Sequence, residues 1–164
     1  MTGTLYFHIA SELIFLILCF AAAFSDLRRY KIPNQVTFPG IMAGAVITLV
    51  TASEPLIKLV VFLLLFLLGP LLFGEGDVKL SMMAVMLLGT RIFILSFLIS
   101  QLLILLVAAL TRPAETRKVL RFLFSCTNYS KQLLIQHAAS IPFAPALFIS
   151  CSMILVWRWY QWIL

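Results

Sequence analysis

The sequence predicts an all-α, polytopic membrane protein with six transmembrane helices. The chain of 164 residues is 63% hydrophobic and only 11% charged, and its mean hydropathy is +1.10. A soluble domain is usually about half apolar and about a quarter charged, so this chain has too little polar surface to cover a water-soluble globule. Its apolar runs approach the ~20 residues that a helix needs to cross a bilayer. We therefore expect residues 1–164 to form a single membrane-embedded domain.

The six expected spans are separated by polar or basic segments. They cover approximately residues 7–24, 38–52, 56–73, 78–88, 92–110 and 141–163. The fourth is shorter than the others. Just before it, Gly69, Pro70 and Gly74 are expected to interrupt the helix, because both residue types disfavour a helix interior. Irregular backbone at membrane depth is tolerated only where it is buried or lines a cavity.

The basic residues predict the orientation of the spans. The formal charge of +6 would suggest a nucleic-acid partner in a soluble protein, but here the basic residues lie mainly between apolar runs, and we expect no such partner. Nine of them fall on one side: Arg28, Arg29, Lys31, Lys79, Arg112, Arg117, Lys118, Arg121 and Lys131. The other side has Lys58, Arg91 and Arg158. By the positive-inside rule, the nine face the cytoplasm and both termini face outward.

Two further expectations follow from this orientation. An aromatic belt of Trp157, Trp159, Tyr160 and Trp162 is expected at the outer interface, where amphipathic rings prefer to lie. The one long loop, about residues 111–140, is expected in the cytoplasm. Its segment 116–124 mixes basic and apolar residues, which fits an interfacial helix on anionic lipid or a solvated basic linker equally well.

Two aspartates lie at the same predicted membrane face. Asp26 ends the first span and Asp77 opens the fourth. The chain crosses the membrane twice between them, so parity places both on the cytoplasmic side. Two carboxylates that share a site hold one proton between them, and such a pair activates a water in aspartic proteases. Two plain alternatives exist: Arg28 or Arg29 neutralises Asp26, and Asp77 is the N-cap of the fourth helix.

The cysteines and histidines give no sign of a metal site. Cys19, Cys126 and Cys151 form no CxxC pair. Neither His8 nor His137 has a partner at ligand spacing. We therefore expect no metal and no other cofactor.

Three motifs extend the pattern around the aspartates. Residues 26–34 read DLRRYKIPN, residues 74–79 read GEGDVK, and residues 141–146 read IPFAPA. These segments resemble the D-x-R-x-x-x-I-P-N, G-x-G-D-x-K and I-P-F-[GA]-P signatures of type IV prepilin peptidases, in the family's order. A lone G-x-G-D would be weak evidence, whereas the three motifs together cover nearly the whole chain.

The resemblance implies an activity and the residues that perform it. Members of the family cleave the basic leader of prepilins on the cytoplasmic side, after a glycine. They use two aspartates and need no metal for cleavage; matched by motif, these are Asp26 and Asp77. The implied partners are a prepilin and membrane lipid, and the implied location is the bacterial cytoplasmic (inner) membrane. Candidate substrate-binding residues are the neighbouring motif residues Gly74, Gly76, Lys79, Pro33 and Asn34.

The chain departs from the long members of this family. Those members carry a cytosolic segment with paired CxxC motifs between the first two spans, which is linked to N-methylation of the new N-terminus. Here only the short segment 25–37 separates these spans, and it has no CxxC. The chain therefore resembles the short form of tight-adherence (Flp) pilus systems, without the N-methyltransferase segment. A smaller departure is Ala144, where glycine is common.

Other functions stay open at this point. One is a different G-x-G-D protease, such as a preflagellin peptidase or a presenilin-like protease. The presenilin type has a Tyr-Asp pair, whereas Ser25 precedes Asp26 here. The other is a non-enzymatic role, as a small transporter or as a membrane component of a pilus or secretion system. Transporters often contain inverted repeats and midplane polar sites, and the sequence shows neither.

Overall fold

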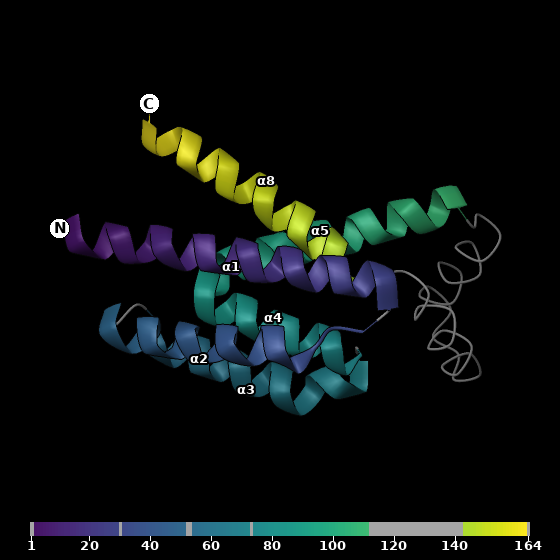
Figure 1. Ribbon diagram of the computed structural model, residues 1–164, viewed down its shortest axis with the longest axis horizontal. Coiled ribbons are helices and arrows are strands. Elements are labelled where there is room, and N and C mark those ends of the chain that lie inside the picture. Colours follow the sequence, from purple (N-terminus) through teal and green to yellow (C-terminus); the bar gives the residue numbers. More distant parts are fainter. Residues whose placement is uncertain (1, 30, 52–53, 73, 112–142, 164) are drawn as a thin grey trace.

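The structure is a computed structural model that describes residues 2–29, 31–51, 54–72, 74–111 and 143–163. These residues form six helices and no strand: α1 (Thr2–Arg29), α2 (Asn34–Thr51), α3 (Pro55–Leu72), α4 (Glu75–Leu88), α5 (Thr90–Thr111) and α8 (Phe143–Ile163). The helices pack side by side in one bundle (Figure 1). The prediction of an all-α fold is confirmed for this part of the chain.

Four of the six helices, α1, α2, α5 and α8, are long and apolar enough to cross a membrane. The apolar part of α3 is shorter and covers Pro55–Pro70. α4 has only 14 residues, or about 21 Å, against the ~30 Å of a bilayer core. The prediction of several membrane-spanning helices is thus confirmed, whereas the count of six spans stays a prediction. The expected cytoplasmic loop, with its segment 116–124, lies outside the described residues beyond Thr111.

The outer surface of the bundle is strongly apolar. Side chains such as Leu49, Leu56 and Leu110 are at least 75% exposed. Burying a leucine side chain gives about 1.5–3 kcal/mol relative to leaving it in water, so such a surface is suited to lipid rather than to water. Small and polar side chains lie inside the bundle instead, among them Thr37 and Ser100.

α4 lies at the centre of the bundle. Nine of its 14 residues are buried, and it packs against α1, α2, α3 and α5. A Cβ at Gly44 of α2 would lie only 2.6 Å from the Cβ of Met86, and a Cβ at Gly40 would collide with Met83. Small residues let helices approach closely in membranes. The two glycines therefore hold α4, and with it Asp77, close against α2.

Gly69, Pro70 and Gly74 were predicted to interrupt the helix before Asp77, and this prediction is wrong for Gly69 and Pro70. α3 continues through both Gly69 and Pro70. A Cβ at Gly69 would lie 2.8 Å from the side chain of Val78, so this glycine permits close packing of α3 on α4. Pro70 falls in the last turn of α3; it has no N–H to donate to the carbonyl four residues earlier, so α3 loses one helical hydrogen bond close to its end.

The two ends of the bundle carry different groups. Both chain termini lie at one end, which we call the terminal end (Figure 1). α1 ends, and α4 and α8 begin, toward the opposite end, which we call the aspartate end. The basic residues predicted to share one membrane side, Lys58, Arg91 and Arg158, do gather at the terminal end around one cavity. Among the described residues, Arg28 and Arg29 lie instead in the last turn of α1, toward the aspartate end, so this part of the predicted charge separation is supported.

Candidate active site

Asp26 lies in the last turn of α1 and is only 6% exposed. Its Oδ2 accepts a hydrogen bond of 3.2 Å from the backbone N–H of Ala144, in the first turn of α8. Amides in the first turn of a helix have no partner within the helix, and they form the positive end of the helix dipole. The start of α8 therefore stabilises the carboxylate form of Asp26.

Asp77 lies in the first turn of α4 and is half-buried. It precedes the apolar stretch that begins at Val78. The N-cap of α4 is Gly74, and no side chain caps the helix. The Oδ2 atom of Asp77 lies 3.5 Å from the position that a Cβ at Gly74 would take. The interpretation of Asp77 as the N-cap is therefore wrong, because that position belongs to Gly74.

The structure brings the two aspartates together at the aspartate end. α1 and α4 pack against each other. Burial and the charge of the nearby Asp26 raise the pKa of Asp77 to about 6. Such an influence is expected of two carboxylates that share a site, since the second is harder to ionise once the first is charged. The pair can hold one proton, with Asp77 as its preferred carrier.

The arginines next to Asp26 have other surroundings. The guanidinium carbon of Arg28 lies over the ring of Phe24, 4.2 Å from its centre, and Arg29 is exposed. No salt bridge between Asp26 and either arginine is found among the described residues. The structure therefore gives no support to neutralisation of Asp26 by these two residues.

Gly76 joins the two aspartate motifs by close packing. A Cβ at Gly76 would lie 3.3 Å from Cβ and 3.4 Å from Cγ1 of Ile32. That residue belongs to the segment between α1 and α2 that also contains Pro33, whose carbonyl accepts a backbone N–H of α2 at 3.0 Å. A Cβ at Gly74, by contrast, would meet only atoms of Asp77 within 4 Å among the described residues. The lack of a side chain at Gly76 therefore lets α4 pack closely against Ile32, whereas the lack of one at Gly74 leaves space next to the Asp77 carboxyl group.

Lys79 and Asn34 are also brought together. The Lys79 ammonium donates to Oδ1 of Asn34 at 3.1 Å and lies 3.6 Å from the carboxylate of Glu75. These contacts tie the start of α4 to the start of α2. The Glu75 side chain is 85% exposed, unlike the half-buried Asp77. A substrate-binding role for Gly74, Gly76, Lys79, Pro33 and Asn34 stays a prediction.

Two contacts were not anticipated from the sequence. One is the hydrogen bond from the Ala144 amide to Asp26. The prolines at 142 and 145 were a usable signal for it, because proline favours the first turn of a helix.

The other contact lies at the terminal end, where Glu12 accepts a hydrogen bond from Trp159 Nε1 at 2.6 Å and pairs with Arg158 at 2.9 Å. Trp159 thus points inward, unlike the exposed Trp157 of the expected aromatic belt. The sequence signal for this contact was Glu12 itself, because an acid within an apolar run needs a partner inside the bundle.

The chemistry that this site offers is acid–base catalysis by two carboxyl groups. Within the described part of the chain, no three His, Cys, Asp or Glu side chains cluster in a way that could hold a metal ion. A protonated and an ionised carboxyl group that flank one reacting centre can donate a proton to it and accept a proton from it.

Comparison with known proteins bears on this site. A family model described as the type IV leader peptidase family matches residues 13–109. The matched range contains both Asp26 and Asp77, whereas residues 141–146 lie beyond it. No curated protein and no solved structure matches the chain. The family match covers more than half of the sequence, and it agrees with a helical membrane bundle that holds two acids at one end. This chain therefore belongs to the type IV leader peptidase family.

Proposed function

We propose that this protein is an aspartyl endopeptidase that cleaves the basic leader of type IV prepilins of the Flp class. Cleavage follows a glycine and takes place on the cytoplasmic side of the bacterial inner membrane. Membership of a leader peptidase family supports the peptidase activity. The three motifs and the short segment between the first two spans support the class of substrate. The observation that carries the proposal is the placement of Asp26, in the last turn of α1, and Asp77, in the first turn of α4, at the same end of two helices that pack against each other.

The two aspartates have different roles in this proposal. Asp26 accepts the Ala144 amide at the start of α8, which offsets part of the cost of burying its charge, and we assign Asp26 as the base. Asp77 has a pKa raised to about 6 by burial and by Asp26, so it holds the shared proton and is the acid. Gly74 leaves space beside the Asp77 carboxyl group, and we expect the cleavage junction to approach from there.

The reaction then needs no group beyond the two acids and one water. Asp26 takes a proton from the water as its oxygen attacks the scissile carbonyl carbon, while Asp77 gives its proton to the carbonyl oxygen. The product is a neutral tetrahedral diol. In the second step Asp77 takes back a hydroxyl proton, Asp26 gives its proton to the leaving nitrogen, and the C–N bond breaks. Both aspartates return to their starting states.

The test is cleavage of a synthetic substrate with a basic leader that ends in glycine before an apolar run. The full chain is purified in detergent as wild type, Asp26→Asn and Asp77→Asn. Each variant is expected to lower kcat by a factor on the order of 10² to 10⁴, the usual contribution of a general acid or base. Equal yield and equal elution volume show that the variants are folded. Near-normal cleavage by either variant would contradict the proposal.

A further inference from the structure

The start of α8 reaches the aspartate end from a part of the chain that the family match does not cover. The match ends at residue 109, whereas α8 begins at Phe143. The Ala144 amide donates to Oδ2 of Asp26 across 118 residues of sequence, and the amide of Phe143 acts on the same carboxylate. Two consecutive amides of α8 thus meet one carboxyl group of the aspartate pair.

The sequence at this point limits which amides are available. Residues 142–145 read Pro-Phe-Ala-Pro. A proline has no N–H, so only the two middle residues of this run have one. The first turn of an ordinary helix leaves several amides without a partner inside the helix. Here the flanking prolines remove the neighbouring donors, and both amides that remain in the run act on Asp26.

The contact between these groups is closed to its surroundings. Asp26 and Phe143 are each 6% exposed, and Ala144 is 0% exposed. A buried acceptor that loses its donor keeps the full cost of its burial, because water does not replace the donor. Hydrogen bonds to an ionised acceptor are also shorter and stronger than those between neutral groups. The two amides therefore restrict how the Asp26 carboxyl group is oriented.

The ring of Phe143 fixes the start of α8 against α5. Its centre lies 6.0 Å from that of Phe97, and the two ring planes are tilted by 59°, a favourable arrangement for an aromatic pair. The Phe97 ring also lies 5.6 Å from that of Phe93 on the same helix, and Phe93 is buried. The two amides are therefore carried by a packed part of the bundle.

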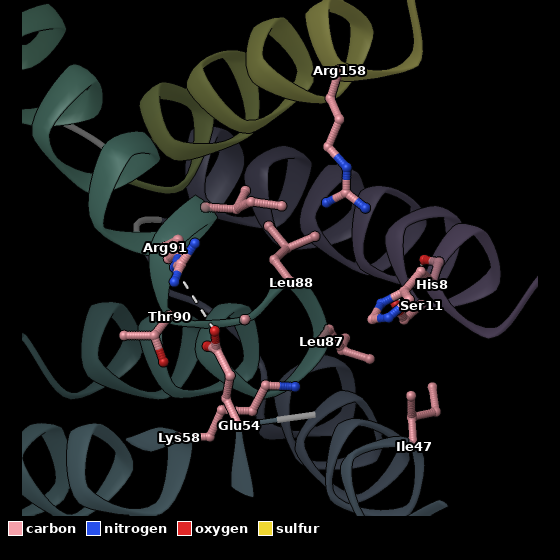
Figure 2. Close-up of a pocket in the computed structure, with 12 residues that line it drawn as sticks. His8, Ser11, Ile47, Glu54, Lys58, Leu87, Leu88, Thr90, Arg91 and Arg158 are labelled. Carbon is pink, nitrogen blue, oxygen red and sulfur yellow. Dashed lines mark hydrogen bonds and ion pairs between the residues drawn. The ribbon is translucent and has the colours of Figure 1, made fainter. Parts of the chain in front are cut away.

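The charged groups around Asp26 give it no salt bridge among the described residues. α1 packs against α2, α4 and α8, and α2 has no charged residue. The only charged residue of α8 is Arg158, which reaches into the cavity at the terminal end (Figure 2). The described charged residues of the aspartate end are Arg28, Arg29, Lys31, Glu75, Asp77 and Lys79. Of these, Asp77 acts on Asp26 as a second acid, and Lys79 is engaged by its contacts with Glu75 and Asn34.

We propose that the N–H groups of Phe143 and Ala144 form an amide clamp that orients Asp26 for its role as the base. This inference rests on the proposed peptidase function. Phe143 and Ala144 are positioning residues, because they act on the reaction through Asp26. The amides offset part of the cost of the buried charge, and the contact of Phe143 with Phe97 holds the amides in place. The active site then consists of three segments: the end of α1, the start of α4 and the start of α8.

The test compares replacements of Ala144 in the full chain, purified in detergent and assayed with the synthetic leader substrate between about pH 4 and 8. Ala144→Pro removes the N–H and should lower kcat by about tenfold or more. Without the donor the base is protonated at a higher pH, so the acid limb of the kcat/KM profile should move up by at least about half a pH unit. Ala144→Val is the matched control, because it adds similar bulk but keeps the N–H; its acid limb should stay within about 0.2 pH units of wild type.

Two further comparisons keep the test decisive if Ala144→Pro does not fold. Lactic acid at position 144 replaces only the N–H by an ester oxygen, and it should shift the acid limb in the same direction. Phe97→Leu removes the ring that holds Phe143 and should lower kcat by about threefold or more. Its control is Phe20→Leu, which removes another tilted ring pair between α1 and α8, that of Phe20 and Phe148 at 5.6 Å, and should stay within about twofold of wild type.

An unshifted acid limb in the proline and ester variants would overturn the amide clamp, and so would an equal shift in Ala144→Val. Equal losses in Phe97→Leu and Phe20→Leu would remove the Phe143 ring from the proposal. These outcomes differ from a failure of the peptidase function, in which the wild type itself does not cleave the substrate or Asp26→Asn cleaves it normally.

Discussion

α1 carries two buried carboxylates, and their surroundings are opposite. Glu12, at the terminal end, is 2% exposed, pairs with Arg158 at 2.9 Å and accepts from the indole of Trp159 at 2.6 Å. Asp26, at the aspartate end, is 6% exposed, accepts a backbone amide and lies near a second acid. Glu12 thus has a cation and an indole N–H as its partners, whereas Asp26 has a backbone amide and a neighbouring acid.

The comparison separates a structural acid from an acid–base pair. Burial alone does not distinguish them, since both carboxylates are almost inaccessible. The partner distinguishes them. Glu12 is paired with the guanidinium of Arg158, whereas Asp26 accepts a neutral amide and lies near a second acid, Asp77. Changes at the two ends should therefore affect different properties of the protein.

The largest expected effect comes from removing the cation of Glu12. Arg158→Met leaves a buried carboxylate without its ion-pair partner and should cost about 3–5 kcal/mol of unfolding free energy. Asp26→Asn keeps an acceptor for the Ala144 amide, so its cost should be below about 1 kcal/mol. Unfolding in detergent, followed by circular dichroism, measures both. The double variant Glu12→Gln/Arg158→Met should recover most of the loss, and equal stability of Arg158→Met and wild type would show that the ion pair has no structural role.

The second prediction concerns the packing that joins the two aspartate motifs. In Gly76→Val the new side chain would meet Ile32, since Cβ alone would lie 3.3 Å from it. Overpacking of this kind costs about 1–3 kcal/mol, and the displaced segment should lower cleavage by about tenfold or more. Glu75→Val is the matched control, because the same side chain is placed one residue earlier at an exposed position. Equal activity of the two variants would remove Gly76 from the account of how the aspartates are held together.

The third prediction concerns pH. Asp77 acts in its protonated form, and its pKa is raised to about 6 by burial and by Asp26. The site is therefore active below that value and loses its acid as the pH rises through it, so kcat/KM should fall by up to about tenfold per pH unit on the alkaline side. The measurement is kcat/KM between about pH 5 and 8. A rise of kcat/KM through pH 6 would instead mean that the active form has lost this proton.

The smallest effect is expected at Glu75, the third acid of the aspartate end. Its side chain is 85% exposed and contacts Lys79 at 3.6 Å. An exposed pair at this helical spacing contributes about 0.3–0.5 kcal/mol, so Glu75→Gln should change cleavage by less than about twofold. Loss of cleavage at normal yield would place Glu75 in the site and would break the distinction drawn between exposed and buried acids.

The features that the sequence predicted well are those that depend on the order of apolar and charged segments along the chain. Three features follow from hydropathy and parity: helices over the apolar runs, the shared end of Asp26 and Asp77, and the separation of Lys58, Arg91 and Arg158 from the described basic residues Arg28, Arg29 and Lys79. Such patterns are dictated by the solvent, because in lipid every backbone group must be paired within the helix.

The features that the sequence could not predict depend on which helix faces which. Gly69 and Pro70 look like a helix break, but Gly69 lies where α3 meets Val78 of α4. Trp159 looks like a residue of an aromatic belt, but it lies where α8 meets Glu12. In each case the local preference of the residue is weaker than the packing between helices. Only the tertiary structure identifies those neighbours.

The contacts between α1 and α8 also set a fixed length between the two ends of the molecule. Glu12 and Asp26 are 14 residues apart on α1, and their partners Arg158 and Ala144 are 14 residues apart on the antiparallel α8. Fourteen residues make nearly four whole turns, about 21 Å, so both contacts fall on the same side of each helix. Inserting or deleting one residue between them would rotate one contact by about 100° and leave only the other intact. The number of residues between the two contacts on each helix is therefore as much a part of this helix pair as the side chains that make them.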